Sequence, residues 1–198
     1  MNGISAIQAT LDATRKTLAW FVSDLSDADL LYRPAPDANH IAWQIGNVIG
    51  GDVFLVKEQV PEALYPELPP GFGDLHGDKG AKKDEGFLTK AEYLKLFDDV
   101  RSATIATLGK LTDADLDRPT KGNFATMAPT LGDLFLLVSN HTFLHVGQFT
   151  VIRRKLGKPV LFLSGFRCPH NTKDAIRYHH SIRARTPIAG ETRCQMNR

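Results

Sequence analysis

The sequence has few cysteines and no long apolar run, and these two shortages exclude several classes of protein. Cys168 and Cys194 are the two cysteines of this 198-residue chain, too few for a disulfide framework or a four-cysteine zinc site. A reducing compartment suits such a chain, so we expect a cytoplasmic protein. No stretch has the apolar length that a bilayer crossing needs, and Met1 does not lead into a basic region followed by an apolar run. We therefore expect neither a membrane partner nor a signal peptide.

An excess of basic charge is missing from most of the chain. Residues 1–166 hold 17 Lys/Arg and 20 Asp/Glu, whereas residues 167–198 hold 7 and 2. A nucleic-acid-binding body needs a basic stripe on its surface, so we expect no nucleic-acid partner. The same contrast predicts a folded domain over residues 1–166 and a basic, loosely ordered extension over residues 167–198.

The period-two alternation of strands is also absent, and the sequence shows helical periodicity instead. Apolar residues recur at spacings of three, four or seven in four segments. Pro and Gly residues interrupt the pattern between them. We therefore expect an all-α protein with four long helices over residues 4–25, 39–60, 89–111 and 130–156.

Three of these segments begin with residues that are typical of helix N-termini. Asn39 is the predicted N-cap of the second helix. Thr89 with Glu92, and Thr130 with Asp133, have the spacing of capping boxes, in which two residues three apart satisfy each other's backbone N–H. These signals fix where the helices begin more firmly than periodicity alone.

An internal repeat links the two halves of the chain. The stretch Leu-Ser-Asp-Ala-Asp-Leu at 25–30 recurs as Leu-Thr-Asp-Ala-Asp-Leu at 111–116, and an Arg-Pro pair follows each copy. Each copy lies between two predicted helices. The sequence therefore predicts two similar helical pairs that pack into a four-helix bundle with an internal pseudo-two-fold.

The residues that point to chemistry lie in the last predicted helix. His141 and His145 share a seam with apolar residues and with Gln148. A separation of four places both imidazoles on one side of a helix, one turn apart, which suits joint binding of a metal ion. Two core histidines bonded to carbonyls or water would give the same pattern. The sequence contains no dinucleotide fingerprint, phosphate loop or nucleophile elbow that would point to another chemistry.

The stretch His141-Thr-Phe-Leu-His145-Val-Gly-Gln148 resembles the H-x-x-x-H-x-G-Q motif of DinB-like proteins. The run Ile-Ala-Trp-Gln-Ile-Gly-Asn at 41–47 is similar to a second motif of that family, and the resemblance extends over about residues 4–162. It implies a four-helix bundle that binds zinc or nickel through three histidines and often forms a homodimer. It also implies, for some members, thiol-dependent transfer or isomerisation with a small-molecule thiol.

The sequence departs from that family at its first metal ligand, because Asn47 stands where the third histidine is expected. An amide oxygen is a weaker donor to zinc or nickel than imidazole. Three interpretations follow: weak binding through His141, His145, Asn47 and water; completion of the site by His76 or His40; or an empty site in which Asn47 bonds a histidine. From this resemblance and its departure at Asn47 we expect either a metal-dependent thiol-linked transferase or hydrolase with a degenerate site, or a non-catalytic binding or dimerisation module.

Overall fold

Four long helices, α1 (Gly3–Val22), α3 (Ile41–Gln59), α5 (Lys90–Leu108) and α6 (Leu131–Lys155), build this protein in a computed structural model. The structure describes residues 1–161, and residues 1–159 form one structural unit. The predicted extension over residues 167–198 lies outside the described part of the chain. The all-α prediction is confirmed, because within residues 1–161 the β contacts amount to one isolated bridge, between Pro119 and Thr130.

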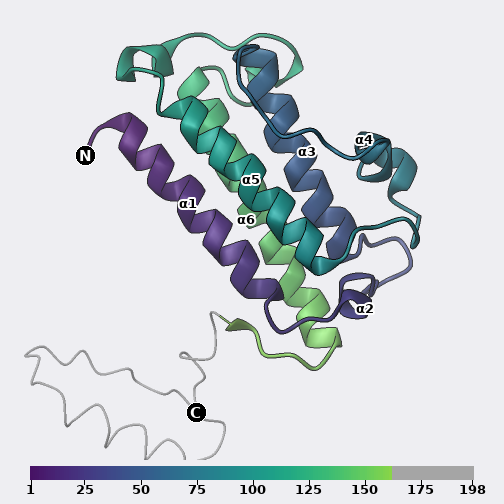
Figure 1. Cartoon of the computed structure of the whole chain (residues 1–198). Coiled ribbons are helices and arrows are strands. Elements are labelled where there is room, and N and C mark those ends of the chain that lie inside the picture. The colour runs from purple at the N-terminus through teal and green to yellow at the C-terminus, as the bar shows by residue number, and fades with distance from the viewer. Residues whose placement is uncertain (162–198) are drawn as a thin grey trace, which may run out of the picture. The chain divides into compact units, whose positions relative to one another are not determined.

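The long helices pack so that α1 touches α5 and α6, and α3 touches the same two. The helices of each sequential pair, α1 with α3 and α5 with α6, therefore lie diagonally across the bundle, whereas α3 and α5 lie side by side. Figure 1 shows this arrangement, with α5 between α1 and α3 in front and α6 behind. Each helix turns apolar side chains inward to a core in which many are almost fully buried, among them Leu11, Leu18, Phe21, Val48, Phe97, Val100, Leu134 and Phe135.

The helix starts follow the capping signals closely. The capping boxes Thr89–Glu92 and Thr130–Asp133 are both formed. The prediction for α3 was wrong by one residue, because His40 and not Asn39 is the N-cap. The Nδ1 atom of His40 accepts a hydrogen bond from the backbone N–H of Trp43 at 3.0 Å. An imidazole nitrogen here does the work of the side-chain oxygen that usually caps a helix.

The internal repeat has a structural counterpart in two capped turns. The first copy forms the short helix α2 (Asp27–Leu30), whose capping box pairs Ser26 with Asp29. The second copy forms the 3₁₀ turn η2 (Asp113–Asp117), whose capping box pairs Thr112 with Asp115. Both turns follow a long helix, so the predicted similarity of the two helical pairs extends to the way in which each pair is joined.

The connection between α3 and α5 holds two short elements, α4 (Phe72–Leu75) and the 3₁₀ turn η1 (Asp78–Gly80). A further 3₁₀ turn, η3 (Asn123–Thr126), precedes α6. The segment with α4 packs against α3. None of the helices in residues 1–161 combines the length and apolar character that a bilayer crossing requires.

Candidate metal centre

The two histidines of α6 face each other at hydrogen-bonding distance. The Nε2 atoms of His141 and His145 lie 3.1 Å apart. His145 is buried, whereas His141 is half-buried and lines a cavity between α3 and α6. The helical spacing therefore brings the two imidazoles together as the sequence predicted.

Gln44 on α3 fixes the tautomer of His145. The Oε1 atom of Gln44 lies 3.1 Å from Nδ1 of His145, and the amide nitrogen of Gln44 donates to the carbonyl of Asn39. Because the amide oxygen can only accept, Nδ1 of His145 carries the hydrogen and Nε2 presents a lone pair. Metal-binding histidines are typically held in this way by a partner on the other ring nitrogen.

The His141 ring retains an unused polar atom. Its Nε2 donates to Nε2 of His145 in the pairing just described, while its Nδ1 is buried without a hydrogen-bond partner. Burying a polar atom destabilises the folded state unless a hydrogen bond or a bound ion compensates for the lost hydration. The pair of imidazoles is thus not a fully satisfied core motif.

Burial keeps both imidazoles neutral. It lowers the pKa of His145 to about 4, and the neighbouring His141 adds to the effect. It also lowers the pKa of His141, and the positive charge of Arg101 adds to that effect. Neutral imidazole is the form that binds a metal ion, so the electrostatics suit ligation at neutral pH.

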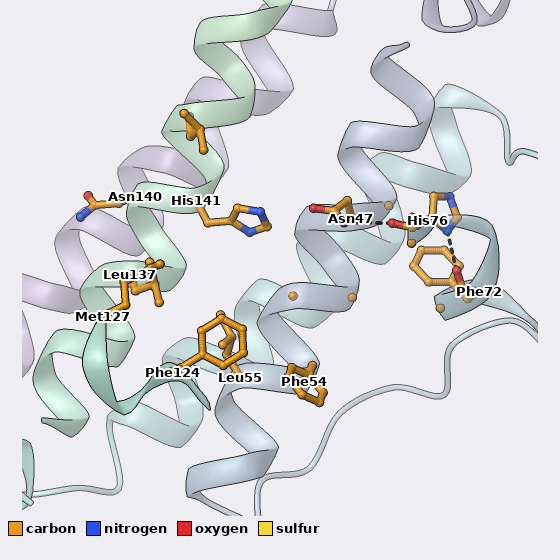
Figure 2. Close-up of a pocket in the computed structure, with 16 residues that line it drawn as sticks. Asn47, Phe54, Leu55, Phe72, His76, Phe124, Met127, Leu137, Asn140 and His141 are labelled. Carbon is orange, nitrogen blue, oxygen red and sulfur yellow. Dashed lines mark hydrogen bonds between the residues drawn. The ribbon is translucent and has the colours of Figure 1, made fainter. Parts of the chain in front are cut away.

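Asn47 lies across the cavity from His141. Its amide nitrogen donates to the backbone carbonyl of His76 at 2.9 Å. The amide orientation is therefore set, and in Figure 2 the side-chain oxygen points toward His141. Asn47 is consequently held by a backbone group and not, as one interpretation of the sequence had it, by a histidine side chain.

The other two candidate histidines are committed to hydrogen bonds of their own. His76 is buried, with Nδ1 2.8 Å from the carbonyl of Phe72 and Nε2 2.6 Å from the hydroxyl of Tyr93. His40 caps α3 through Nδ1, and its Nε2 lies 3.1 Å from the carbonyl of Lys83. Neither ring has a free nitrogen to offer.

The ring of His76 fits against α3 because residue 46 is glycine. A Cβ atom at Gly46 would lie less than 3.0 Å from ring atoms of His76, and Cβ atoms in proteins essentially never come that close to another atom. The close approach lets the carbonyl of His76 reach Asn47. Gly46 and His76 therefore hold Asn47 in position.

A buried ion pair lies next to the histidines. Arg101 on α5 and Asp52 on α3 are both fully buried, with Nε of Arg101 2.9 Å from Oδ2 of Asp52. Arg101 also donates to Thr14 on α1 at 3.1 Å and to Thr142 on α6 at 2.7 Å. The Arg101 side chain thus connects all four long helices. Its contact on α6 is Thr142, the residue directly after His141.

The donor set fits a divalent ion in part. Two nitrogens bound to one tetrahedral zinc ion at the usual bond length lie about 3.3 Å apart, close to the 3.1 Å between the two Nε2 atoms. The oxygen of Asn47 is a third, weaker donor on the facing helix. Within residues 1–161, no third His, Cys, Asp or Glu joins the pair. The residues therefore suit an ion with two strong ligands and open positions.

Sequence reasoning missed Gln44 and Arg101, and placed Gln148 wrongly. Gln148 is exposed and does not share the buried seam. A signal for Arg101 was present, since it continues the inward stripe of α5 that Phe97 and Val100 begin, and such a position seldom holds an unpaired charge. Gln44 gave no comparable signal, because its role depends on the crossing of α3 and α6.

Comparison with known proteins agrees with this fold. The sequence model of the DinB superfamily matches residues 10–149. A conserved protein from Enterococcus faecalis has a similar structure at a TM-score of 0.60, with 15% identity over 80% of this chain and 99% of its own. YfiT of Bacillus subtilis, described as a probable metal-dependent hydrolase with an unusual four-helix bundle topology, is similar at a TM-score of 0.59, with 16% identity over 79% of this chain and 89% of its own. No curated protein matches the sequence.

Proposed function

This chain belongs to the DinB superfamily, and on that premise we propose that it binds one divalent metal ion, zinc or nickel, and uses it on a small organic substrate. The carrying observation is the pair of Nε2 atoms 3.1 Å apart beside a cavity of about 850 Å³. The description of YfiT as a probable metal-dependent hydrolase supports the choice of chemistry.

His141 and His145 would hold the ion through Nε2, with the ring hydrogen of His141 moved to Nδ1, and Asn47 would add its amide oxygen. Gln44 keeps Nδ1 of His145 protonated and so keeps Nε2 free to bind. When bound, such an ion supplies Lewis-acid chemistry, polarising a substrate carbonyl and lowering the pKa of a water molecule or small-molecule thiol beside it. The cavity walls bring the substrate to the open side of the histidine pair.

Turnover of a neutral ester tests the proposed activity. We expect p-nitrophenyl acetate to be hydrolysed faster by the zinc- or nickel-loaded protein than by the chelator-treated protein. The gain should disappear in His145→Ala. Gln148→Ala is the matched control, because this exposed residue lies on the same helix, one turn beyond His145. Equal rates with and without metal, or a gain that survives in His145→Ala, would contradict the proposal.

The second candidate is a non-catalytic bundle that acts as a binding or homodimerisation module. Two observations favour it: Asn47 stands in place of a stronger ligand, and α6 exposes three large apolar side chains that do not line the cavity, namely Leu136, Phe143 and Val151. A site that has lost a ligand should regain affinity in Asn47→His. Restored zinc affinity together with an inactive wild type would select this second candidate.

A further inference from the structure

The cavity beside the histidine pair has walls of one chemical kind. The described residues that line it are uncharged, and most are apolar or glycine, among them Gly50, Phe54, Phe124, Met127, Leu137 and Leu144. Its volume of about 850 Å³ falls in the range of small-molecule sites in proteins. The cavity is therefore large enough for an organic ligand and offers that ligand almost no charge.

Three large apolar side chains at this cavity remain exposed to solvent. Phe54, Met127 and Leu144 are 58%, 69% and 62% exposed. Phe54 and Phe124 meet edge to face across the gap between α3 and η3, with ring centroids 6.1 Å apart. In Figure 2 Phe124 lies between Phe54, which belongs to α3, and Leu137 and Met127 on the opposite side. A cluster of exposed apolar side chains around a cavity is typical of a binding site.

The floor of the cavity is widened by a glycine. Nothing lies within 4 Å of the place that a Cβ atom of Gly50 would occupy. A side chain there would project into open space without meeting protein atoms. Glycine inside a helix costs about 1 kcal/mol relative to alanine, and here the folded structure provides no close packing in return. The missing side chain leaves room for a ligand.

The polar groups of the cavity are neutral, and few of them are free. Both ring nitrogens of His76 are hydrogen-bonded, one to the carbonyl of Phe72 and the other to the hydroxyl of Tyr93. Asn47 and His141 point toward each other, while Asn140 points away from both in Figure 2. The groups that remain for a ligand thus sit at the end where the metal donors lie.

Charge would be poorly tolerated along these walls. Arg101, the cation whose field reaches His141, is fully buried and paired with Asp52. A carboxylate or sulfonate placed against the apolar walls would lose its hydration without gaining a partner.

We propose that this cavity binds a neutral, apolar organic molecule whose single polar group reaches the His141–Asn47 end. The proposal names the substrate class for the metal centre of the preceding section and rests on that function for its chemistry. The binding step itself needs only the cavity, so it is testable in metal-free protein. Two fluorescent probes with the same body allow the test: N-phenyl-1-naphthylamine, which is neutral, and 8-anilinonaphthalene-1-sulfonate, which is anionic.

Both probes are titrated into the full chain after chelator treatment. We expect saturable binding of the neutral probe at one site per chain, at least about tenfold tighter than binding of the anionic probe. In Gly50→Leu the new side chain fills the cavity, so the affinity for the neutral probe should fall by about tenfold or more. Gly147→Leu is the matched control, because Gly147 is an exposed helical glycine with nothing within 4 Å and does not line the cavity.

Three results would overturn the proposal. They are equal affinity for the two probes, equal loss in Gly50→Leu and Gly147→Leu, and probe binding that declines as the protein concentration rises and a dimer forms. The last would identify the cavity as an interface between copies. Failure of the metal function leaves a different trace, because a chain that binds no metal would still separate the two probes.

Discussion

Gly46→Ala tests whether the ring of His76 packs directly on α3, the contact beside which its carbonyl holds Asn47. The new methyl would overlap the ring of His76, which packs directly on the backbone of α3. Overpacking of this kind costs about 1–3 kcal/mol. Displacing the ring also breaks its hydrogen bonds to Phe72 and Tyr93, at 2.8 and 2.6 Å, worth about 1 kcal/mol each. We expect Gly46→Ala to lower the free energy of unfolding by about 3 kcal/mol.

The same substitution should change sign when the ring is removed. In a His76→Gly background the methyl meets no imidazole, so Gly46→Ala should raise the free energy of unfolding by up to about 1 kcal/mol, as alanine does in a helix interior. Gly50→Ala, one turn further along α3 and facing open space, should be neutral or stabilising in both backgrounds. Urea unfolding followed by circular dichroism measures all of these values. The same cost for Gly46→Ala in both backgrounds would refute the reasoning.

Other predictions follow from the buried charges and the cavity. Arg101→Met leaves the carboxylate of Asp52 buried without its partner and should cost about 3–5 kcal/mol in urea unfolding; adding Asp52→Leu should recover part of it, and strict additivity would contradict the pairing. Burial lowers the pKa of His40 below its ordinary value of 6.5, so the unfolded chain binds more protons below that pH and stability should fall as the pH drops. The fall should be shallower in His40→Asn, which keeps a capping side chain, and an unchanged slope would count against a neutral buried imidazole. Gly51→Ala places a methyl 3.1 Å from the ring of His141 and should weaken zinc affinity measured by calorimetry; unchanged affinity would show that the ring can move freely.

Most of the fold was predictable from local signals. The capping boxes at Thr89 and Thr130 and the repeated Asp-Ala-Asp turns act over three or four residues, so they are legible in the sequence. The diagonal placement of α1 with α3, and of α5 with α6, was not predicted from periodicity. Periodicity tells which face of a helix is buried, but not which neighbour covers it.

The candidate site divides in the same way. The pairing of His141 and His145 follows from helical spacing, and the structure places them as expected. The roles of Gln44 and His76 depend on contacts across 101 and 29 residues of sequence. His76 looked like a spare ligand in the sequence, yet its ring is used to seat a loop on Gly46 and its carbonyl to orient Asn47. These separate roles of the His76 ring and the His76 carbonyl can be recognised only when the packing of the helices is known.

Zinc binding by untagged protein tests the central claim most directly. Equilibrium dialysis with elemental analysis should give one ion per chain for the wild type, loss of that ion in His141→Ala/His145→Ala, and tighter binding in Asn47→His, because imidazole is the stronger donor. The double variant also serves as the control for the cysteines and histidines of residues 167–198. A wild type that takes up no zinc and no nickel, or a double variant that binds as well as the wild type, would contradict a metal centre at this histidine pair.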